Sequence, residues 1–308
     1  MRLRDAGAYI RGRVVLGLTQ ALASRGPASP PAPLPLEAVL AERDPDPIRL
    51  AQVFEGRLNP ERQTLVARYL AARGIAFATQ RFSSLAGPGE NYVVDVGSGP
   101  RLLVLIAHHD AVSGSPGAND NAAAIGILLR QLVRLGAGPP PPLRVRFLFT
   151  AAEELGYLGA RAYAREMSAS QVAGVVSLEL CGVGDSPVLW DVERDSALSG
   201  AFSSAMEGLG YRRDESYHVV GRVPGFGSDH RAFAVLGIPA YGLTMVPAEH
   251  AEALRGFIFH PWRSLVRARA RRPPPFDTYH TAWDRSETLD PSALDRVRLA
   301  LDALIQSV

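Results

Sequence analysis

The chain has 308 residues, 47% of them hydrophobic and 21% charged, which is the balance of a soluble globular protein with a substantial core. Its formal net charge of +2 gives no electrostatic reason to expect nucleic acid or an acidic membrane surface as a partner. Every basic residue apart from histidine is an arginine, and the absence of lysine excludes Schiff-base catalysis and a lysine-containing phosphate loop.

Residues 1–35 are predicted to form an N-terminal helix and a proline-rich arm, outside a main domain that comprises residues 36–308. The alternative for the N-terminus is a cleaved signal peptide, because arginines precede a weakly apolar stretch, although Thr19 and Gln20 interrupt it. We therefore favour a cytoplasmic location, with a secreted or periplasmic location as the alternative. No apolar run approaches the roughly 18 residues that a membrane span needs. The single cysteine, Cys181, permits no internal disulfide and is expected to be buried.

After the arm, helices and strands alternate along the chain. A helix is predicted over residues 59–74, and the apolar run in RLLVLIAHHDAV, residues 101–112, is typical of a strand buried on both faces. Alternation requires crossover connections, so we expect an α/β fold with a mostly parallel, mixed central sheet flanked by helices on both faces. The other predicted strands are 91–97, 139–151, 172–180, 186–192 and 237–246, and the other helices are 119–136, 156–167, 195–210 and 292–308.

Residues 248–279 interrupt this alternation and predict a long irregular loop. Five arginines and no acid fall between Arg263 and Arg272. One hypothesis is a lid that favours acidic or carboxylate-bearing substrates. The alternative is a solvated basic loop.

Three of the predicted strands end in ionisable side chains. The carboxyl ends of parallel strands meet at one edge of an open α/β sheet, which is where ligands of such folds bind. A glycine-containing turn brings a further acid, Asp120, to a helix start at the same edge. The residues expected to converge there are His108, Asp110, Asp120, Glu153, Glu154 and Glu179.

Each of these residues alone has a structural explanation, such as a helix cap for Asp120 or a first-turn acid for Glu153. Together they would repel one another, and burial would raise the pKa values of the carboxylates. Cations relieve this repulsion, and carboxylates with imidazole suit zinc. His280 is the second imidazole of choice. His109 is expected to face away from His108, because neighbouring side chains of a strand point to opposite faces. His218, His250 and His260 are expected to be surface or loop residues.

Five blocks in this order resemble the M28 family of zinc aminopeptidases, over roughly residues 45–305. The blocks are AHHDAVSGSPGANDNAAA, TAAEELGYLGARAY, SLELCGVG, GFGSDHRAFAVLGIPAYGL and YHTAWDRSETLD.

The resemblance implies a co-catalytic site with two zinc ions, although one ion is possible. It implies a cis peptide bond between Asp120 and Asn121 and a peptide or aminoacyl-amide substrate. It also implies a role for each site residue. His108 and Glu179 would hold one zinc ion, Glu154 and His280 would hold the other, and Asp120 would bridge both. Glu153 would be the general base, Asp110 would orient His108, and Asp229 is a candidate for binding the substrate amine, with a structural acid in a turn as its alternative.

Glu179 departs from the family, which usually has aspartate at this position. A longer ligand could bind differently, weaken that metal or select another one. A glutaminyl-cyclase-type acyl transferase with a single zinc, and a non-catalytic binding domain on the same fold, therefore remain alternatives to the peptidase. All five ligand positions carry ligating residues, which argues against the non-catalytic domain.

Overall fold

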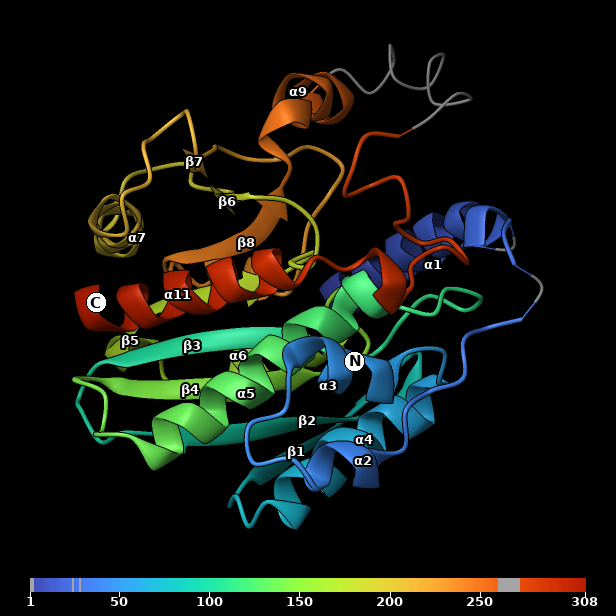
Figure 1. Cartoon of the computed structure of the whole chain (residues 1–308), viewed down its shortest axis with the longest axis horizontal. Helices are drawn as coiled ribbons and strands as arrows, with labels where there is room; N and C mark the ends of the chain where they lie inside the picture. The colour runs from blue at the N-terminus through green and yellow to red at the C-terminus, as the bar shows by residue number, and fades with distance from the viewer. Residues whose placement is uncertain (1–2, 24, 28, 260–271) are drawn as a thin grey trace.

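The computed structural model describes residues 3–23, 25–27, 29–259 and 272–308. A mixed sheet of eight strands, in the order β1-β2-β4-β3-β5-β8-β6-β7, forms the centre of the fold within the described residues (Figure 1). Its strands are β1 (Ala78–Ser84), β2 (Gly87–Val96), β3 (Leu102–His108), β4 (Arg144–Thr150), β5 (Val172–Leu178), β6 (Ser186–Trp190), β7 (His218–Val219) and β8 (Ala240–Val246).

The centre of the sheet is parallel and its flanks are mixed. Strands β4, β3, β5 and β8 pair in parallel, whereas β2 and β6 are antiparallel to their central neighbours. This confirms the predicted mixed, mostly parallel sheet. Strand β1 was not predicted, because it is an edge strand without a fully buried residue and so carries no apolar run.

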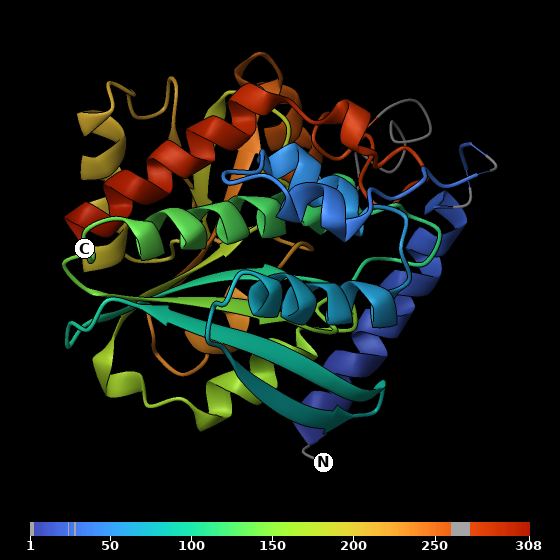
Figure 2. The ribbon, with the colours of Figure 1, turned by 60° about the horizontal axis from the view of Figure 1, so that its bottom comes forward.

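Helices cover both faces of the sheet (Figures 1 and 2). One face packs into a large core with α2 (Leu36–Leu40), α3 (Pro47–Phe54), α4 (Asn59–Ala72), α5 (Ala123–Ala137), α7 (Ala197–Gly208) and α11 (Pro291–Ser307). The other face packs with α6 (Leu158–Glu166) and α8 (His230–Ala234). The N-terminal helix α1 (Leu3–Ala23) contacts the turn before α6, where Gly12 lies against the backbone of Leu155.

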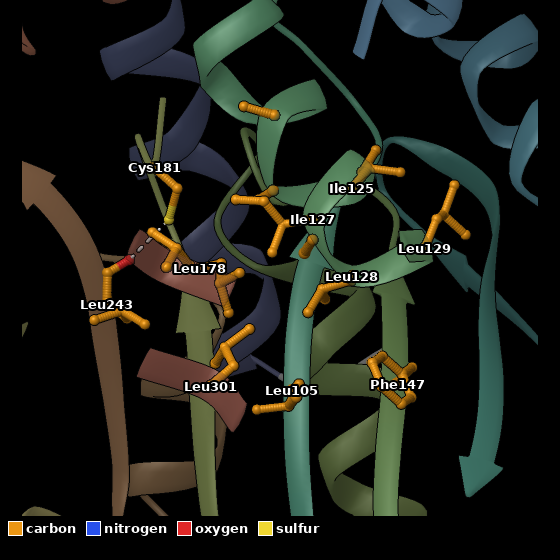
Figure 3. Close-up of a cluster of buried hydrophobic side chains, with 14 of the residues drawn as sticks. Leu105, Ile125, Ile127, Leu128, Leu129, Phe147, Leu178, Cys181, Leu243 and Leu301 are labelled. Carbon is orange, nitrogen blue, oxygen red and sulfur yellow. Dashed lines mark hydrogen bonds between the residues drawn. The ribbon is translucent and has the colours of Figure 1, made fainter. Parts of the chain in front are cut away.

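The sequence of β3 is apolar because the strand is buried on both faces of the sheet. Leu103 and Leu105 belong to the α5 side of the sheet, and Val104 and Ile106 to the α6 side. Figure 3 shows side chains of α5, among them Leu128, in the same cluster as Leu105 of β3 and Phe147 of β4. A strand held on both faces places the residues that follow it with little freedom.

The predicted irregular loop over 248–279 is wrong in part. Residues Ala248–His250 form a short 3-10 helix, and Ala251–Phe259 form helix α9. This helix is anchored by Leu254, which packs in a small apolar cluster with Leu180 and Phe276. Most of the arginine-rich segment, including Arg263 and Arg267, lies outside the described residues.

Cys181 is buried, as predicted. Its Sγ lies 3.5 Å from the carbonyl oxygen of Leu243 (Figure 3). Burial raises the pKa of this thiol, so it is an uncharged side chain of the core. Over the part of the chain that the structure describes, none of the helices is both long and apolar enough to cross a membrane.

Candidate metal centre

The site lies where β3, β4 and β5 end. His108 is the last residue of β3, Glu153 and Glu154 follow β4, and Glu179 directly follows β5. Strands β3 and β4 run side by side in the same direction, so their carboxyl ends lie at one edge (Figure 1). His280 reaches the same edge from the segment before α11. The structure therefore brings together all the residues that the sequence proposed as metal ligands.

The first ligand set comprises His108, Asp120 and Glu179. Nε2 of His108 lies 3.3 Å from Oδ1 of Asp120 and 3.6 Å from Oε2 of Glu179. One donor atom from each residue falls within 4.8 Å of the others, a grouping that can hold a metal ion.

The second ligand set comprises Asp120, Glu154 and His280. Nε2 of His280 lies 3.1 Å from Oδ2 of Asp120 and 3.1 Å from Oε2 of Glu154. The two carboxylate oxygens of Asp120 thus face different histidines, which is the arrangement that a carboxylate bridging two metal ions requires. The peptide bond between Asp120 and Asn121 is cis, as the resemblance implied.

The donor atoms fit a cation. Within the described residues, Nε2 of His108, Nε2 of His280 and Oε1 of Glu154 are buried and have no hydrogen-bond partner, although buried polar atoms ordinarily have one. Burial raises the pKa values of Glu154 and Glu179. Burial lowers the pKa of His280, but the neighbouring Glu154 and Asp120 outweigh it and raise that pKa to about 10. The site therefore carries an excess of negative charge, and imidazole with carboxylate is a donor set that zinc accepts.

Asp110 connects His108 to the loop that carries the two glutamates. Its carboxylate oxygens accept hydrogen bonds from the backbone N–H groups of Glu153, at 3.1 Å, and Glu154, at 3.2 Å. Nδ1 of His108 lies 3.1 Å from the carbonyl oxygen of Asp110 and 3.5 Å from its carboxylate. Such a contact fixes the ring so that Nε2 points to the metal site.

Asp284 supports the Asp120 turn, and nothing in the sequence singled it out for this role. Its carboxylate accepts hydrogen bonds from the backbone N–H groups of Asn119, at 2.7 Å, and Asp120, at 3.2 Å. Burial raises the pKa of Asp284 to about 7. The only signal in the sequence is an acid four residues after His280, which looks no different from a surface carboxylate.

Arg62 is a second residue that the sequence did not single out. Its guanidinium is fully buried and donates to backbone carbonyls, among them His109 at 2.6 Å and Pro116 at 3.3 Å. It thereby holds the segment between His108 and Asp120 from behind. An arginine within the predicted helix over residues 59–74 looks like an ordinary exposed residue in the sequence.

His109 faces away from the ligands, as predicted, with Nε2 3.1 Å from the carbonyl oxygen of Glu90. Burial lowers its pKa to about 4. Of the other predicted surface histidines, His250 is 42% exposed, whereas His218 is half-buried in β7 and lines a cavity beside the metal centre. His260 lies outside the described residues.

Asp229 does not lie where direct contact with a substrate requires. Its side chain has no exposed surface, and its carboxylate accepts a hydrogen bond from the hydroxyl of Thr150. Burial raises its pKa to about 7. The predicted contact with the substrate amine is therefore wrong for this arrangement, because Asp229 lies behind the surface that a substrate could reach.

The cavity, of about 620 Å³, opens above the metal centre. Asp120, Glu153 and Glu179 line it, and most of its remaining wall is apolar. The apolar wall includes Leu180, Trp190, Phe226, Leu254, Phe276 and Tyr279. Asp214, Glu252 and Arg255 add charged groups elsewhere on the wall, so the cavity combines a large apolar surface with several charged side chains.

The solved structures similar to this chain share its fold. BSAP, a zinc aminopeptidase from Bacillus subtilis, superimposes with a TM-score of 0.57 at 21% identity, over 72% of this chain and 50% of that one. A glutaminyl cyclase from an Acidobacteriales bacterium superimposes with a TM-score of 0.64 at 18% identity, over 92% of this chain and 98% of the cyclase. At these identities the likeness establishes the architecture only.

The relatives in sequence include a leupeptin-inactivating enzyme and an aminopeptidase. Leupeptin-inactivating enzyme 1 of Streptomyces exfoliatus is 29% identical over 233 residues, which are 74% of this chain and 50% of that enzyme. Aminopeptidase YwaD of Bacillus subtilis is 36% identical over 73 residues, which are 24% of this chain and 16% of YwaD. The chain thus spans half or less of these relatives. The model of peptidase family M28 matches residues 91–305, which is well over half of the chain and includes every proposed ligand. The chain belongs to peptidase family M28.

Proposed function

We propose that the protein is a zinc-dependent aminopeptidase that hydrolyses the amide bond after the first residue of a peptide. The observation that carries this proposal is the pair of ligand sets that share Asp120 and lie in a mostly apolar cavity, with Glu153 beside them. Membership of the M28 family supports peptide substrates and zinc. We further propose that residues 36–308 form the catalytic unit, because α2, α3 and α4 pack into the same core as the matched region.

We assign one zinc ion to His108, Asp120 and Glu179 and a second to Asp120, Glu154 and His280. Zinc bound in such sites lowers the pKa of water and polarises a carbonyl group. Asp110 keeps Nε2 of His108 directed at its site by contacting Nδ1 on the other side of the ring. The distances between these side chains support the proposed roles, and we leave Asp229 out of the substrate contacts because its side chain is fully buried.

Glu153 is the proposed general base. It lines the cavity and belongs to neither of the two ligand sets that share Asp120, although its carboxylate also groups with His108 and Glu154, and we assign it to proton transfer. Burial raises its pKa well above the usual range, with nearby Glu179 and Glu154 adding to the effect, which makes it a stronger proton acceptor than an exposed glutamate. It takes a proton from the attacking water and delivers it to the departing amine.

The cavity favours a substrate with a free amine and an apolar first side chain. A positively charged α-amine is attracted to the carboxylates of the floor, while the aromatic and aliphatic wall accommodates the side chain. An internal segment of a protein offers no such amine. These features favour an exopeptidase.

Metal analysis combined with a panel of aminoacyl amides tests the proposal. We expect two zinc ions per chain, hydrolysis of leucyl and phenylalanyl amides, loss of activity on chelation and recovery with zinc. Glu153→Ala is expected to lower kcat by at least about 100-fold while zinc content stays at the wild-type level. Activity within a few fold of wild type in Glu153→Ala would show that another group is the base, and chelator-resistant hydrolysis would overturn the metal assignment.

The specific alternative is a glutaminyl-cyclase-type acyl transfer with one zinc. The fold similarity to a cyclase covers more of both chains than the similarity to BSAP does. The presence of two ligand sets favours the peptidase, because a single-zinc enzyme needs only one of them and does not require His108 and Glu179 in addition to Asp120, Glu154 and His280. One zinc per chain, together with cyclisation of N-terminal glutamine and no hydrolysis of leucyl amide, would establish the alternative.

A further inference from the structure

The segment GFGSDHR, residues 225–231, contributes to the cavity wall and also contacts a residue of the metal centre. Phe226 and Gly227 line the cavity, and the hydroxyl of Ser228 donates a hydrogen bond to Oε1 of Glu179. A Cβ atom at position 227 would clash with the hydroxyl of Tyr157 and the guanidinium of Arg231, so a side chain there would force these groups to move. The position of this segment therefore affects both the shape of the cavity and the setting of a proposed metal ligand.

Asp191 holds the far end of this segment. Its Oδ2 accepts a hydrogen bond from Nε of Arg231 at 2.6 Å and lies 3.0 Å from Nε2 of His230, and its Oδ1 contacts Nη2 of Arg231 at 3.1 Å. Oδ1 also accepts from the backbone N–H of Val223 at 2.8 Å, and Arg231 donates to the carbonyl oxygen of the same residue at 2.7 Å. The side chain of Asp191 is only 6% exposed. One buried carboxylate thus fixes both Val223 and the start of α8.

Trp190 connects this cluster to the cavity. It directly precedes Asp191, lines the cavity, and its indole N–H donates to the hydroxyl of Thr244 at 3.0 Å. The ring of His230 stands edge-on to it, with centroids 4.6 Å apart and an interplanar angle of 88°. The Asp191 cluster therefore lies directly behind the wall formed by Trp190 and Val223.

We propose that Asp191 is a positioning residue that sets the cavity wall and, through the 225–231 segment, holds Ser228 against Glu179. The inference rests on the proposed aminopeptidase function for its kinetic part, and on the proposed ligand role of Glu179 for its metal part. Removing the charge of Asp191 leaves the partly buried guanidinium of Arg231 without its counter-ion, which loosens the segment. Groups that support a metal ligand in this way typically change metal affinity by about 10- to 100-fold.

The chain supplies a matched control for this cluster. Glu193 and Arg222, which lie next to the contact of Asp191 with Val223, form an ion pair of 3.0 Å. Their side chains are 57% and 63% exposed. An exposed pair of this kind contributes little. Asp191→Asn removes the charge of a buried carboxylate, and Glu193→Gln removes the charge of an exposed carboxylate two residues away.

The experiment titrates zinc into the metal-free full-length chain and measures kcat and KM for leucyl amide in wild type, Asp191→Asn and Glu193→Gln. For Asp191→Asn we expect about tenfold weaker binding of one of the two zinc ions, unchanged binding of the other, and a KM raised about tenfold with kcat within threefold at saturating zinc. Glu193→Gln is expected to stay within twofold of wild type in every value. If Asp191→Asn does not fold, Arg231→Lys keeps the charge but loses the two-point contact, and the same shifts are expected at smaller size.

Zinc affinities and KM within twofold of wild type in a folded Asp191→Asn would overturn the inference. It would equally be overturned if the variant lowered only the melting temperature, because a purely structural residue does that. The zinc titration does not depend on activity. A wild-type chain that binds zinc without hydrolysing aminoacyl amides therefore removes the proposed function and leaves the inference to be decided by the zinc affinities.

Discussion

Ser228 provides a direct test of how Glu179 is held. The Ser228 hydroxyl donates to Oε1 of Glu179, and its oxygen lies 2.9 Å from the hydroxyl of Ser177, so the three side chains form a buried chain of hydrogen bonds. Ser228→Ala removes a hydrogen bond to a charged group, which is worth about 1.5–3 kcal/mol. In this variant Oε1 of Glu179 loses the Ser228 hydroxyl as a hydrogen-bond donor. The carboxylate is then free to turn away from His108.

Free energies of that size correspond to roughly 10- to 100-fold in a binding constant. We therefore expect Ser228→Ala to weaken zinc binding at the site of His108, Asp120 and Glu179 by this factor. Zinc binding at the site of Glu154 and His280 should change by less than about threefold, because Ser228 contacts neither residue.

Competition between the protein and a chromogenic chelator measures both affinities in one titration. Ser177→Ala is the graded control, because Ser177 contacts Ser228 and its effect on Glu179 is indirect. Its shift is expected to be smaller than that of Ser228→Ala. Equal weakening of both zinc ions by Ser228→Ala, or no weakening of either, would refute the reasoning.

Two further predictions concern groups that support the site from behind. The buried His109 has a pKa of about 4 against 6.5 for an ordinary histidine, so it contributes stability that is present above pH 6.5 and is lost as the pH falls towards 4. By linkage, wild type should lose about 2 kcal/mol more unfolding free energy than His109→Gln between pH 7 and pH 4.5, as measured by urea unfolding; parallel pH profiles would contradict the pKa shift. In Asp284→Asn one oxygen still accepts a hydrogen bond from the Asp120 turn, but the other backbone N–H group of the turn faces an amide NH2 group. This change should cost about 1–3 kcal/mol of stability. It should also weaken the binding of both zinc ions, since both use Asp120. Zinc binding at wild-type strength in that variant would show that the turn is held by other contacts.

The convergence of the ligands could be predicted from sequence because it follows from topology. Buried apolar runs identified β3, β4 and β5, and parallel neighbours necessarily end at the same edge of the sheet. The residues that follow these runs must therefore lie close together in any parallel arrangement of the three strands. The rejection of His109 as a ligand followed from the alternation of side chains along one strand, which is a local property.

The supporting residues could not be predicted, because their contacts join segments far apart in the sequence. Asp284 contacts the backbone of Asp120, and Arg62 contacts the carbonyl of His109, in each case across dozens of residues. A carboxylate or guanidinium looks the same in the sequence whether it is solvated or fully buried. Asp229 shows the opposite error, because its glycine-rich surroundings suggested an accessible loop while the fold covers its side chain completely.

The resemblance implies an aspartate at position 179, where this chain has a glutamate, and the structure indicates how this longer side chain is accommodated. Oε1 of Glu179 is occupied by Ser228, while Oε2 lies 3.6 Å from Nε2 of His108. One oxygen is thus committed to the protein and one is directed into the first ligand set. In this arrangement Oε2 is the oxygen that is free of the Ser228 hydrogen bond and nearer to His108. The additional methylene group therefore extends the reach of the ligand. The position of its carboxylate depends on the hydrogen bond from Ser228. Ser228 belongs to the 225–231 segment, which also forms part of the cavity wall, so the position of Glu179 is coupled to that wall.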